Sequence, residues 1–147
     1  MPYSTRELFA RLIKCEAGGE GINGMKAVAT VIMNRVHVTS GQYLRTGEGS
    51  LRKVIQEPGE FTCLMSAFSG QVNPQTIWAS DPEQIHYDVA DWALSGNRFY
   101  GAAECLWYMN PFTASCPVYF PYNRSGSIFN RVGKHCFYQP TSLYYKT

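Results

Sequence analysis

The sequence predicts an α+β fold that is mostly α-helical, formed by a single domain over residues 1–147, with a small β-hairpin near the C-terminus. Two patterns carry this prediction. Apolar residues recur with helical spacing in the first two thirds of the chain, whereas the last third has short aromatic runs separated by Pro, Gly and Asn. Hydrophobic residues make up 45% of the chain and charged residues 16%, which is typical of a globular protein.

The first predicted helix runs from Thr5 to Ala17. Ser4 and Glu7 have the spacing of a capping box, in which a hydroxyl side chain accepts a hydrogen bond from a backbone N–H of the first turn. Gly18 and Gly19 follow, and glycine is the residue that most often ends a helix.

A second helix with a wide apolar face is predicted over residues 23–36. The next segment, 37–50, is polar and contains three glycines, so we expect a loop there. A short helix follows over Leu51–Gln56 and stops before Pro58.

Asp81 and Pro82 predict the start of a further helix, with Asp81 as the N-cap and Pro82 at the first helical position. Gly96 should end this helix. Beyond it, the breaker residues predict loops and a small hairpin within residues 118–138.

Glu16 stands where the first helix should present an apolar residue, because it follows Leu8 and Leu12 at steps of four along one stripe. A carboxyl group in that position is partly desolvated, which raises its pKa and favours the protonated form that a general acid requires. A solvated or capping Glu near a helix end is the alternative, and the spacing alone leaves both open.

The charge pattern argues against nucleic acid as a partner. The net charge is +2, the isoelectric point is about 8.3, and Lys and Arg are scattered along the chain. We also expect no membrane span, since no apolar run approaches the roughly 18 residues that one requires. No cofactor and no metal are expected, because the three His residues and the Cys residues lack zinc-ligand spacing.

Five cysteines are present, and the first residues lack the apolar segment of a secretory signal. An odd count in such a chain favours free, mostly buried thiols. Cys15, beside Lys14, is a weak candidate for a nucleophile, and a thiol packed in the helix is the favoured interpretation.

Aromatic residues are unusually frequent, with ten Tyr, eight Phe and three Trp, most of them in the last third of the chain. Two interpretations stay open. These rings fill a small core and its rim, or they form a groove in which the apolar faces of sugars stack on them.

Several ordered blocks together resemble the SleB/CwlJ family of spore-cortex cell-wall hydrolases. The run Glu16-Ala17-Gly18-Gly19-Glu20 is the most informative of them. The blocks are residues 10–21 with Gly24, 31–36, 54–61, 106–111 and 135–141. The resemblance implies a lysozyme-like fold related to lytic transglycosylases, and a cortex-lytic enzyme that cleaves the bond between N-acetylmuramic acid and N-acetylglucosamine in peptidoglycan during germination.

The resemblance also implies that Glu16 is the catalytic acid. A lytic transglycosylase, which needs this carboxyl alone, is the favoured route. The alternative is a hydrolase that acts as a muramidase or glucosaminidase and uses a second carboxylate or an activated water. Glu20 is the nearest second carboxylate, although a structural role at the start of the second helix is favoured for it, and Glu60 is a remote candidate. A non-catalytic spore-coat protein that binds glycan is the third possibility.

Five residues are predicted to bind substrate: Glu20, Phe61, Tyr108, Asn110 and His135. An aromatic ring beside an amide suits an N-acetylated sugar. Each also has a structural interpretation: Phe61 as a core anchor, Asn110 as part of an ordinary turn, and His135 as a buried residue bonded to a backbone carbonyl, which is favoured over catalysis.

The family resemblance implies the partners and the location as well. The expected partner is cortex peptidoglycan that contains muramic-δ-lactam, together with a spore-coat protein that anchors the enzyme. The expected location is the boundary of coat and cortex, after synthesis in the mother-cell cytoplasm without a signal peptide.

Overall fold

The computed structural model describes residues 3–68, 70–121 and 123–147. Met1, Pro2, Ser69 and Tyr122 lie outside the described residues, so the expectation about the N-terminal segment falls partly on residues that are not described. The helices are α1 (Thr5–Ala17), α2 (Gly21–His37), α3 (Gln42–Gly47), α4 (Leu51–Gln56) and α5 (Gln84–Leu94), with 3₁₀ turns at Thr62–Leu64 and Tyr144–Lys146. The strands are β1 (Ala67–Phe68), β2 (Gln71–Val72), β3 (Trp107–Met109), β4 (Gly126–Val132) and β5 (His135–Pro140).

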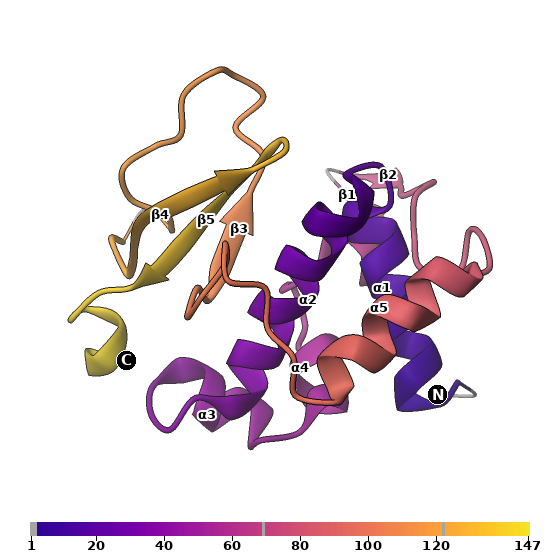
Figure 1. Ribbon diagram of the computed structural model, residues 1–147, viewed down its shortest axis with the longest axis horizontal. Helices are drawn as coiled ribbons and strands as arrows, with labels where there is room; N and C mark the ends of the chain where they lie inside the picture. The colour runs from indigo at the N-terminus through magenta and orange to yellow at the C-terminus, as the bar shows by residue number, and fades with distance from the viewer. Residues whose placement is uncertain (1–2, 69, 122) are drawn as a thin grey trace.

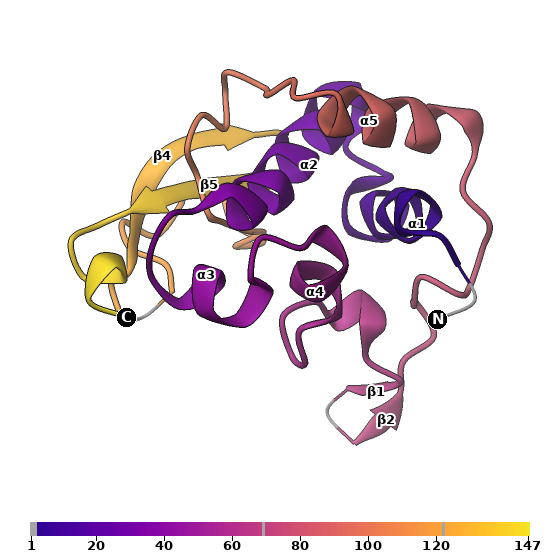
Figure 2. The ribbon, with the colours of Figure 1, turned by 90° about the horizontal axis from the view of Figure 1, so that it is seen from below.

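Helix α2 lies in the middle of the molecule (Figure 1). Helices α1 and α5 pack on one side of it, and the sheet of β3, β4 and β5 lies on the other side (Figure 2). Seventeen residues long, α2 contributes eleven buried residues, so it joins the helical half of the core to the sheet.

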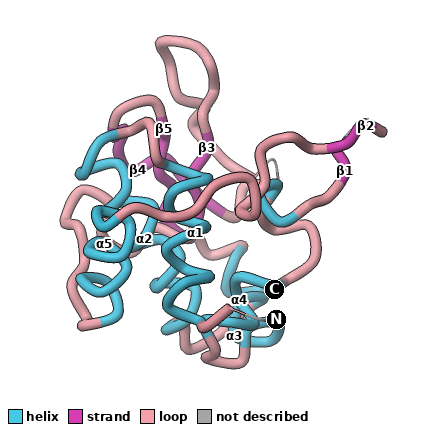
Figure 3. Tube along the Cα trace, turned by 90° about the vertical axis from the view of Figure 1, so that its right-hand side faces the viewer, coloured by secondary structure: helices cyan, strands magenta, loops and turns pink. Residues whose placement is uncertain are grey.

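The C-terminal sheet is antiparallel, with the strand order β3-β5-β4. The predicted hairpin is confirmed as β4 and β5, which turn at Gly133 with a positive φ of 59°. Strand β3 was not predicted as a strand, because three residues are too few to show alternation. In the register, Tyr108 of β3 pairs with Phe137 of β5. A separate small hairpin, β1–β2, stands away from this sheet (Figure 3).

Helix α1 has the predicted bounds, and its start shows why. Ser4 is in the extended conformation, and its Oγ accepts a hydrogen bond from the Glu7 N–H at 3.1 Å. The Glu7 carboxylate, however, accepts from Nε of Arg11 at 2.9 Å. The hydroxyl half of the capping box is therefore present, while the carboxylate is used one turn further along the helix.

Two predicted boundaries were wrong. The segment 37–50 was expected to be a loop, yet it contains α3, which buries Tyr43. Asp81 was expected to cap α5, but the N-cap is Glu83. Asp81 instead accepts a hydrogen bond from Nη2 of Arg11 at 2.8 Å. In both cases a contact with a residue far along the chain outweighs the local sequence signal. Sequence spacing does not show such contacts.

The core consists of two clusters of buried residues. The larger one joins the apolar faces of α1, α2, α4 and α5. The smaller one lies between the sheet, α3 and the C-terminal turn, and four of its six members are aromatic. These six residues are Tyr43, Leu106, Trp107, Cys136, Tyr138 and Tyr144. Part of the aromatic excess in the sequence is therefore core filling.

The expectation of free thiols was wrong for four of the five cysteines. Cys15 is bonded to Cys63, and Cys116 is bonded to Cys136, with Cα–Cα separations of 6.2 and 5.9 Å. Cys105 is a buried free thiol, and its burial raises the pKa to about 12. An odd cysteine count says nothing about which residues the fold brings together, and the partners are 48 and 20 residues apart.

Within the described residues, no helix combines the length and the apolar character that crossing a membrane demands.

Arg11 is a buried arginine that connects α1 to the segment before α5. Its Nη1 donates to the carbonyl oxygens of Ile77 and Ser80, at 3.0 and 3.2 Å. Arg11 is only 5% exposed and its bond to the Ile77 carbonyl is buried, so that carbonyl group has little access to water as a substitute partner.

We expect Arg11→Met to destabilise the protein by roughly 2 kcal/mol, because the substitution leaves the buried Ile77 carbonyl group without its donor. Urea unfolding with the disulfides intact measures this change. Arg6→Met is the matched control on the same helix: Arg6 pairs with Asp91 at 2.7 Å, but both side chains are about half exposed, so little change is expected. Equal unfolding midpoints for the two variants would contradict the role given to Arg11.

Candidate active site

A cleft of about 740 Å³ lies where the end of α1 meets the sheet. The C-terminal turn of α1, the 3₁₀ turn at Thr62–Leu64, strand β3 and the residues after it line this cleft. Five of the six residues predicted for the site line it, and they come from both ends of the chain. These five are Glu16, Glu20, Tyr108, Asn110 and His135.

The sixth predicted residue, Phe61, lies in an adjoining hollow of about 250 Å³. This hollow shares Glu16, Glu60 and Tyr108 with the cleft, so the two form one continuous depression with Glu16 at the junction. Phe61 is only 3% exposed and belongs to the larger core cluster. The core interpretation of Phe61 is therefore confirmed, although its ring also lines the hollow.

Glu16 is a buried carboxyl group of the site. Burial raises its pKa from the usual value, while the hydrogen bond from Tyr108 and the positive charge of Arg35 act in the opposite direction. The Tyr108 hydroxyl donates to Oε1 of Glu16, and Sγ of Cys63, in the disulfide with Cys15, lies 2.9 Å from Oε2. The pKa shift that the apolar stripe predicted has the expected direction and cause.

Tyr108 is held as a neutral donor. Its pKa is raised well above the usual value, first by burial and then by the negative charge of Glu16. The pairing of β3 with β5 fixes its backbone, and the ring of His135 stands edge-on to its own ring at 5.4 Å between centroids. Tyr108 was predicted as a lining residue, and its contact with Glu16 was not foreseen.

Arg35 is a functional candidate that the sequence reasoning missed. It is 5% exposed, and its Nε donates to the Leu106 carbonyl at 2.7 Å. A signal existed in the sequence. Arg35 continues the apolar stripe of α2 formed by Val28, Val31 and Ile32, which is the same anomaly that identified Glu16 in α1.

Glu60 was only a remote candidate, yet the structure places it in the same cleft. Its Oε2 lies 3.4 Å from Nη1 of Arg35 and 3.4 Å from the hydroxyl of Tyr43. Burial raises the pKa of Tyr43 to about 12, so this phenol stays protonated at neutral pH and donates. Two donors therefore already engage the Glu60 carboxylate.

Glu20 occupies the N-cap position of α2, but its side chain makes no capping hydrogen bond. Its Oε1 instead accepts from the backbone N–H of Lys134 at 2.8 Å and lies 3.3 Å from Nδ1 of His135. Glu20 therefore has a structural role, as favoured from the sequence, but its carboxylate does not cap α2. The carboxylate ties the β4–β5 turn to the start of α2, and a Cβ at Gly133 would lie 2.8 Å from it.

His135 does not have the expected backbone carbonyl as its partner. Its Nδ1 lies 3.3 Å from the Glu20 carboxylate oxygen, with a geometry that falls short of a hydrogen bond. Burial lowers the pKa of His135, while Glu20 acts to raise it. The imidazole is therefore favoured in its neutral form at neutral pH.

Asn110 forms the turn that its sequence neighbours suggested, because its Oδ1 accepts from the Phe112 N–H at 2.8 Å. It also lines the cleft. As for metals, no three or more His, Cys, Asp or Glu side chains in residues 3–68, 70–121 and 123–147 are grouped to hold an ion.

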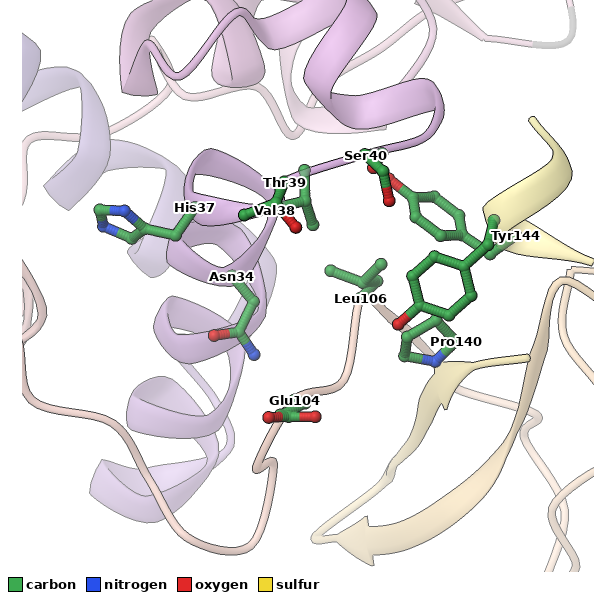
Figure 4. A pocket seen from close by; sticks show the side chains of 10 residues that line it. Asn34, His37, Val38, Thr39, Ser40, Glu104, Leu106, Pro140 and Tyr144 are labelled. Atoms are coloured by element: carbon green, nitrogen blue, oxygen red, sulfur yellow. The ribbon is translucent and has the colours of Figure 1, made fainter. Parts of the chain in front are cut away.

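A second hollow, of about 270 Å³, lies between the end of α2 and the C-terminal residues (Figure 4). It is lined by Asn34, Leu106, Tyr144 and neighbouring side chains, with Glu104 as the carboxylate. Of its described lining residues, none also lines the cleft around Glu16. Because Glu16, the carboxyl group with the raised pKa, lies in the cleft and not in this hollow, the cleft is the candidate active site.

Comparison with known proteins identifies a family and several relatives of this chain. The cell wall hydrolase family matches residues 19–138. The cell wall hydrolase CwlJ of Bacillus subtilis is 32% identical over 136 residues, which cover 92% of this chain and 85% of that protein. A spore cortex-lytic enzyme of Oceanobacillus iheyensis is 34% identical over 140 residues, covering 89% of this chain and 40% of that protein.

The fold is also similar to a solved structure. The catalytic domain of the germination-specific lytic transglycosylase SleB from Bacillus anthracis superposes with a TM-score of 0.63 at 27% identity, covering 94% of this chain and 98% of that domain. The mostly helical, lysozyme-like architecture with a small antiparallel sheet is thereby confirmed. The family match begins three residues after Glu16, so the case for this residue rests on the geometry of the cleft.

We expect Tyr108→Phe to raise the pKa of Glu16 further. The Tyr108 hydroxyl stabilises the charged carboxylate, and its removal leaves the opposing effect of burial less compensated. Carbon-13 NMR titration of the Glu16 carboxyl group measures the shift. Tyr100→Phe, at an exposed position, is the control, and a lower pKa in Tyr108→Phe than in the parent protein would contradict this account.

Proposed function

The chain belongs to the cell wall hydrolase family, and we propose that it cleaves the bond between N-acetylmuramic acid and N-acetylglucosamine in spore-cortex peptidoglycan during germination. The observation that carries the proposal is the buried Glu16 carboxyl group, with its raised pKa, at the junction of the cleft and its adjoining hollow. A groove of this kind admits a glycan strand on both sides of the reacting bond.

In the proposed first step, protonated Glu16 donates its proton to the glycosidic oxygen while the bond to the muramyl anomeric carbon breaks. Positive charge develops on that sugar, and Glu16 becomes a carboxylate. The hydroxyl of Tyr108 and the charge of Arg35 then stabilise the new anion, since both favour the charged form. The site thus supports both protonation states of one residue.

The second step is proposed to be that of a lytic transglycosylase. The Glu16 carboxylate takes the proton of the muramyl 6-hydroxyl, whose oxygen bonds to the anomeric carbon and gives a 1,6-anhydro end. The lack of a free second carboxylate supports this choice within the described cleft. Arg35 and Tyr43 engage Glu60, and the Lys134 N–H engages Glu20.

Hydrolysis is the second candidate, and one observation favours it: Glu60 lines both the cleft and the hollow together with Glu16. A carboxylate on the far side of the sugar is able to activate a water, as in inverting glycosidases. A non-catalytic protein that binds spore-coat glycan is the remaining alternative, and it predicts no dependence on Glu16.

The other predicted residues receive binding or structural roles in this proposal. Tyr108 and Asn110 contact sugar in the cleft, and Phe61 supports the adjoining hollow from the core side. Glu20 and His135 hold the β4–β5 turn against α2 at the cleft wall. Residues 1–147 act together as one catalytic domain, because helices and sheet both contribute to the cleft.

The finer statements about context also remain part of the proposal. The substrate is cortex glycan containing muramic-δ-lactam, and a spore-coat protein anchors the enzyme at the boundary of coat and cortex. The relative named as a spore cortex-lytic enzyme supports a role at the cortex.

Glu16→Gln is expected to lower cortex lysis by about 10²–10⁴-fold, the usual contribution of a general acid. Release of muropeptides from purified cortex peptidoglycan measures this loss. The fold should remain, because Gln keeps an acceptor for the Tyr108 hydroxyl. Undiminished lysis by Glu16→Gln would favour the non-catalytic alternative.

The same substitution has a pH-dependent effect on stability. The folded-state pKa of Glu16 is raised, so its stabilising contribution is present below the unfolded value of 4.5 and is lost as the pH rises through the folded value. Glu16→Gln should therefore be more stable than the parent protein at neutral pH, and this gain should vanish in acid. Thermal unfolding across that pH range measures the difference.

Mass spectrometry of the products decides between the two chemistries. We expect 1,6-anhydromuramic ends, and the same ends from Glu60→Gln even if its rate falls. Reducing muramic ends that disappear in Glu60→Gln would establish the hydrolase instead. Free stem peptides would overturn glycosidase chemistry altogether.

A further inference from the structure

Phe112 is an exposed aromatic residue at the mouth of the cleft. Its side chain is 87% exposed, and it lines the same cleft as Glu16. It follows strand β3 in the sequence, and the segment between β3 and β4 projects beyond the sheet at the top of Figure 1. An exposed Phe alone is ordinary, but one that borders a cleft with a perturbed carboxyl group is a candidate binding residue.

The backbone of Phe112 is in an unfavourable conformation. Its φ is +56°, in the left-handed region that bulky L-residues rarely adopt. The Asn110 side chain stabilises this turn by accepting from the Phe112 N–H. Strained residues of this kind persist where the surrounding structure holds them, and they cluster at binding sites.

The loop that carries Phe112 is closed at both ends on one residue. Met109 pairs with Cys136 across β3 and β5, and Cys116 is bonded to Cys136 by a disulfide. Residues 110–115 therefore leave and return to the same point of the sheet. A short closed loop has few conformations to lose on binding, so it presents the ring in a fixed position at little entropic cost.

We propose that Phe112 is a stacking platform for one sugar ring of the peptidoglycan strand, at the end of the cleft next to Asn110. The apolar C–H face of a pyranose ring suits the face of a Phe side chain, and Asn110 stands beside it at the cleft wall. This inference rests on the proposed function, because the glycan strand is the ligand that reaches both Glu16 and Phe112. A protein-docking surface is the competing explanation for the exposed ring.

Binding and turnover test the platform separately. In the full chain carrying Glu16→Gln, calorimetry with a purified oligosaccharide of alternating N-acetylglucosamine and N-acetylmuramic acid measures affinity. Phe112→Ala should weaken binding roughly tenfold, and Phe112→Tyr should keep it. In the active protein, Phe112→Ala should raise KM with little change in kcat, because a stacking contact of this kind binds the ground state and the transition state alike.

Phe112→Gly distinguishes a binding role from a structural one. Glycine removes the ring and also relieves the positive φ, so the melting temperature should rise while the affinity falls. Tyr100→Ala is the matched control: Tyr100 has the same exposed fraction of 87% and does not line the cleft, so its affinity should equal that of the parent.

The outcomes separate this inference from the proposed function. If the parent binds glycan and Phe112→Ala binds equally well, the platform is overturned while the enzyme proposal stands, and the ring belongs to a protein-docking surface. If the parent neither binds nor cleaves peptidoglycan, the proposed function fails and the platform fails with it.

Discussion

The desolvation of one carboxyl group, that of Glu16, is the constraint on which the rest of the site depends. Burial at the end of α1 favours its protonated form, whereas Tyr108 and Arg35 favour its charged form. Without burial, the protonated form of Glu16 would lose its advantage. Without Tyr108 and Arg35, the charged form would be too high in free energy. The role proposed for Glu16, first as an acid and then as a base, needs this balance, and the surrounding fold supplies it.

The balance explains why the site spans the whole molecule. Glu16 lies on α1, Arg35 on α2 and Tyr108 on β3, so the two halves of the fold must meet for the three groups to interact. Helix α2 makes this contact because it packs against α1 and α5 and also against the sheet. Glu20 adds a polar tie from the start of α2 to the β4–β5 turn. The disulfide of Cys15 and Cys63 then fixes the cleft wall beside the carboxyl group.

Sequence reasoning succeeded where the physical signal is local. The bounds of α1 follow from Ser4 and from apolar residues at steps of three and four. The β4–β5 hairpin follows from breakers that flank aromatic runs. The raised pKa of Glu16 follows from its place on an apolar stripe. The same spacing on α2 marks Arg35, so the sequence carries a signal for this residue too.

Other features were beyond the reach of local patterns. Helix α3 exists because Tyr43 packs against Trp107 and Tyr144, which lie far along the chain. Asp81 bonds to Arg11 across 70 residues and leaves the capping of α5 to Glu83. The disulfides join residues whose proximity only the packed helices and sheet create.

The sequence by itself determined which apolar faces of α1 and α2 are buried, including the position of a carboxyl group in such a stripe, because burial there follows from the periodicity of each helix. The tertiary structure alone decided which groups those buried polar atoms meet. Tyr108 reaches Glu16 from 92 residues away, and Glu20 turns from the expected cap to the Lys134 N–H, 114 residues away. Periodicity shows which face of a helix is buried. The hydrogen-bond partner of a buried polar group depends on how distant segments pack, and the whole chain determines that packing.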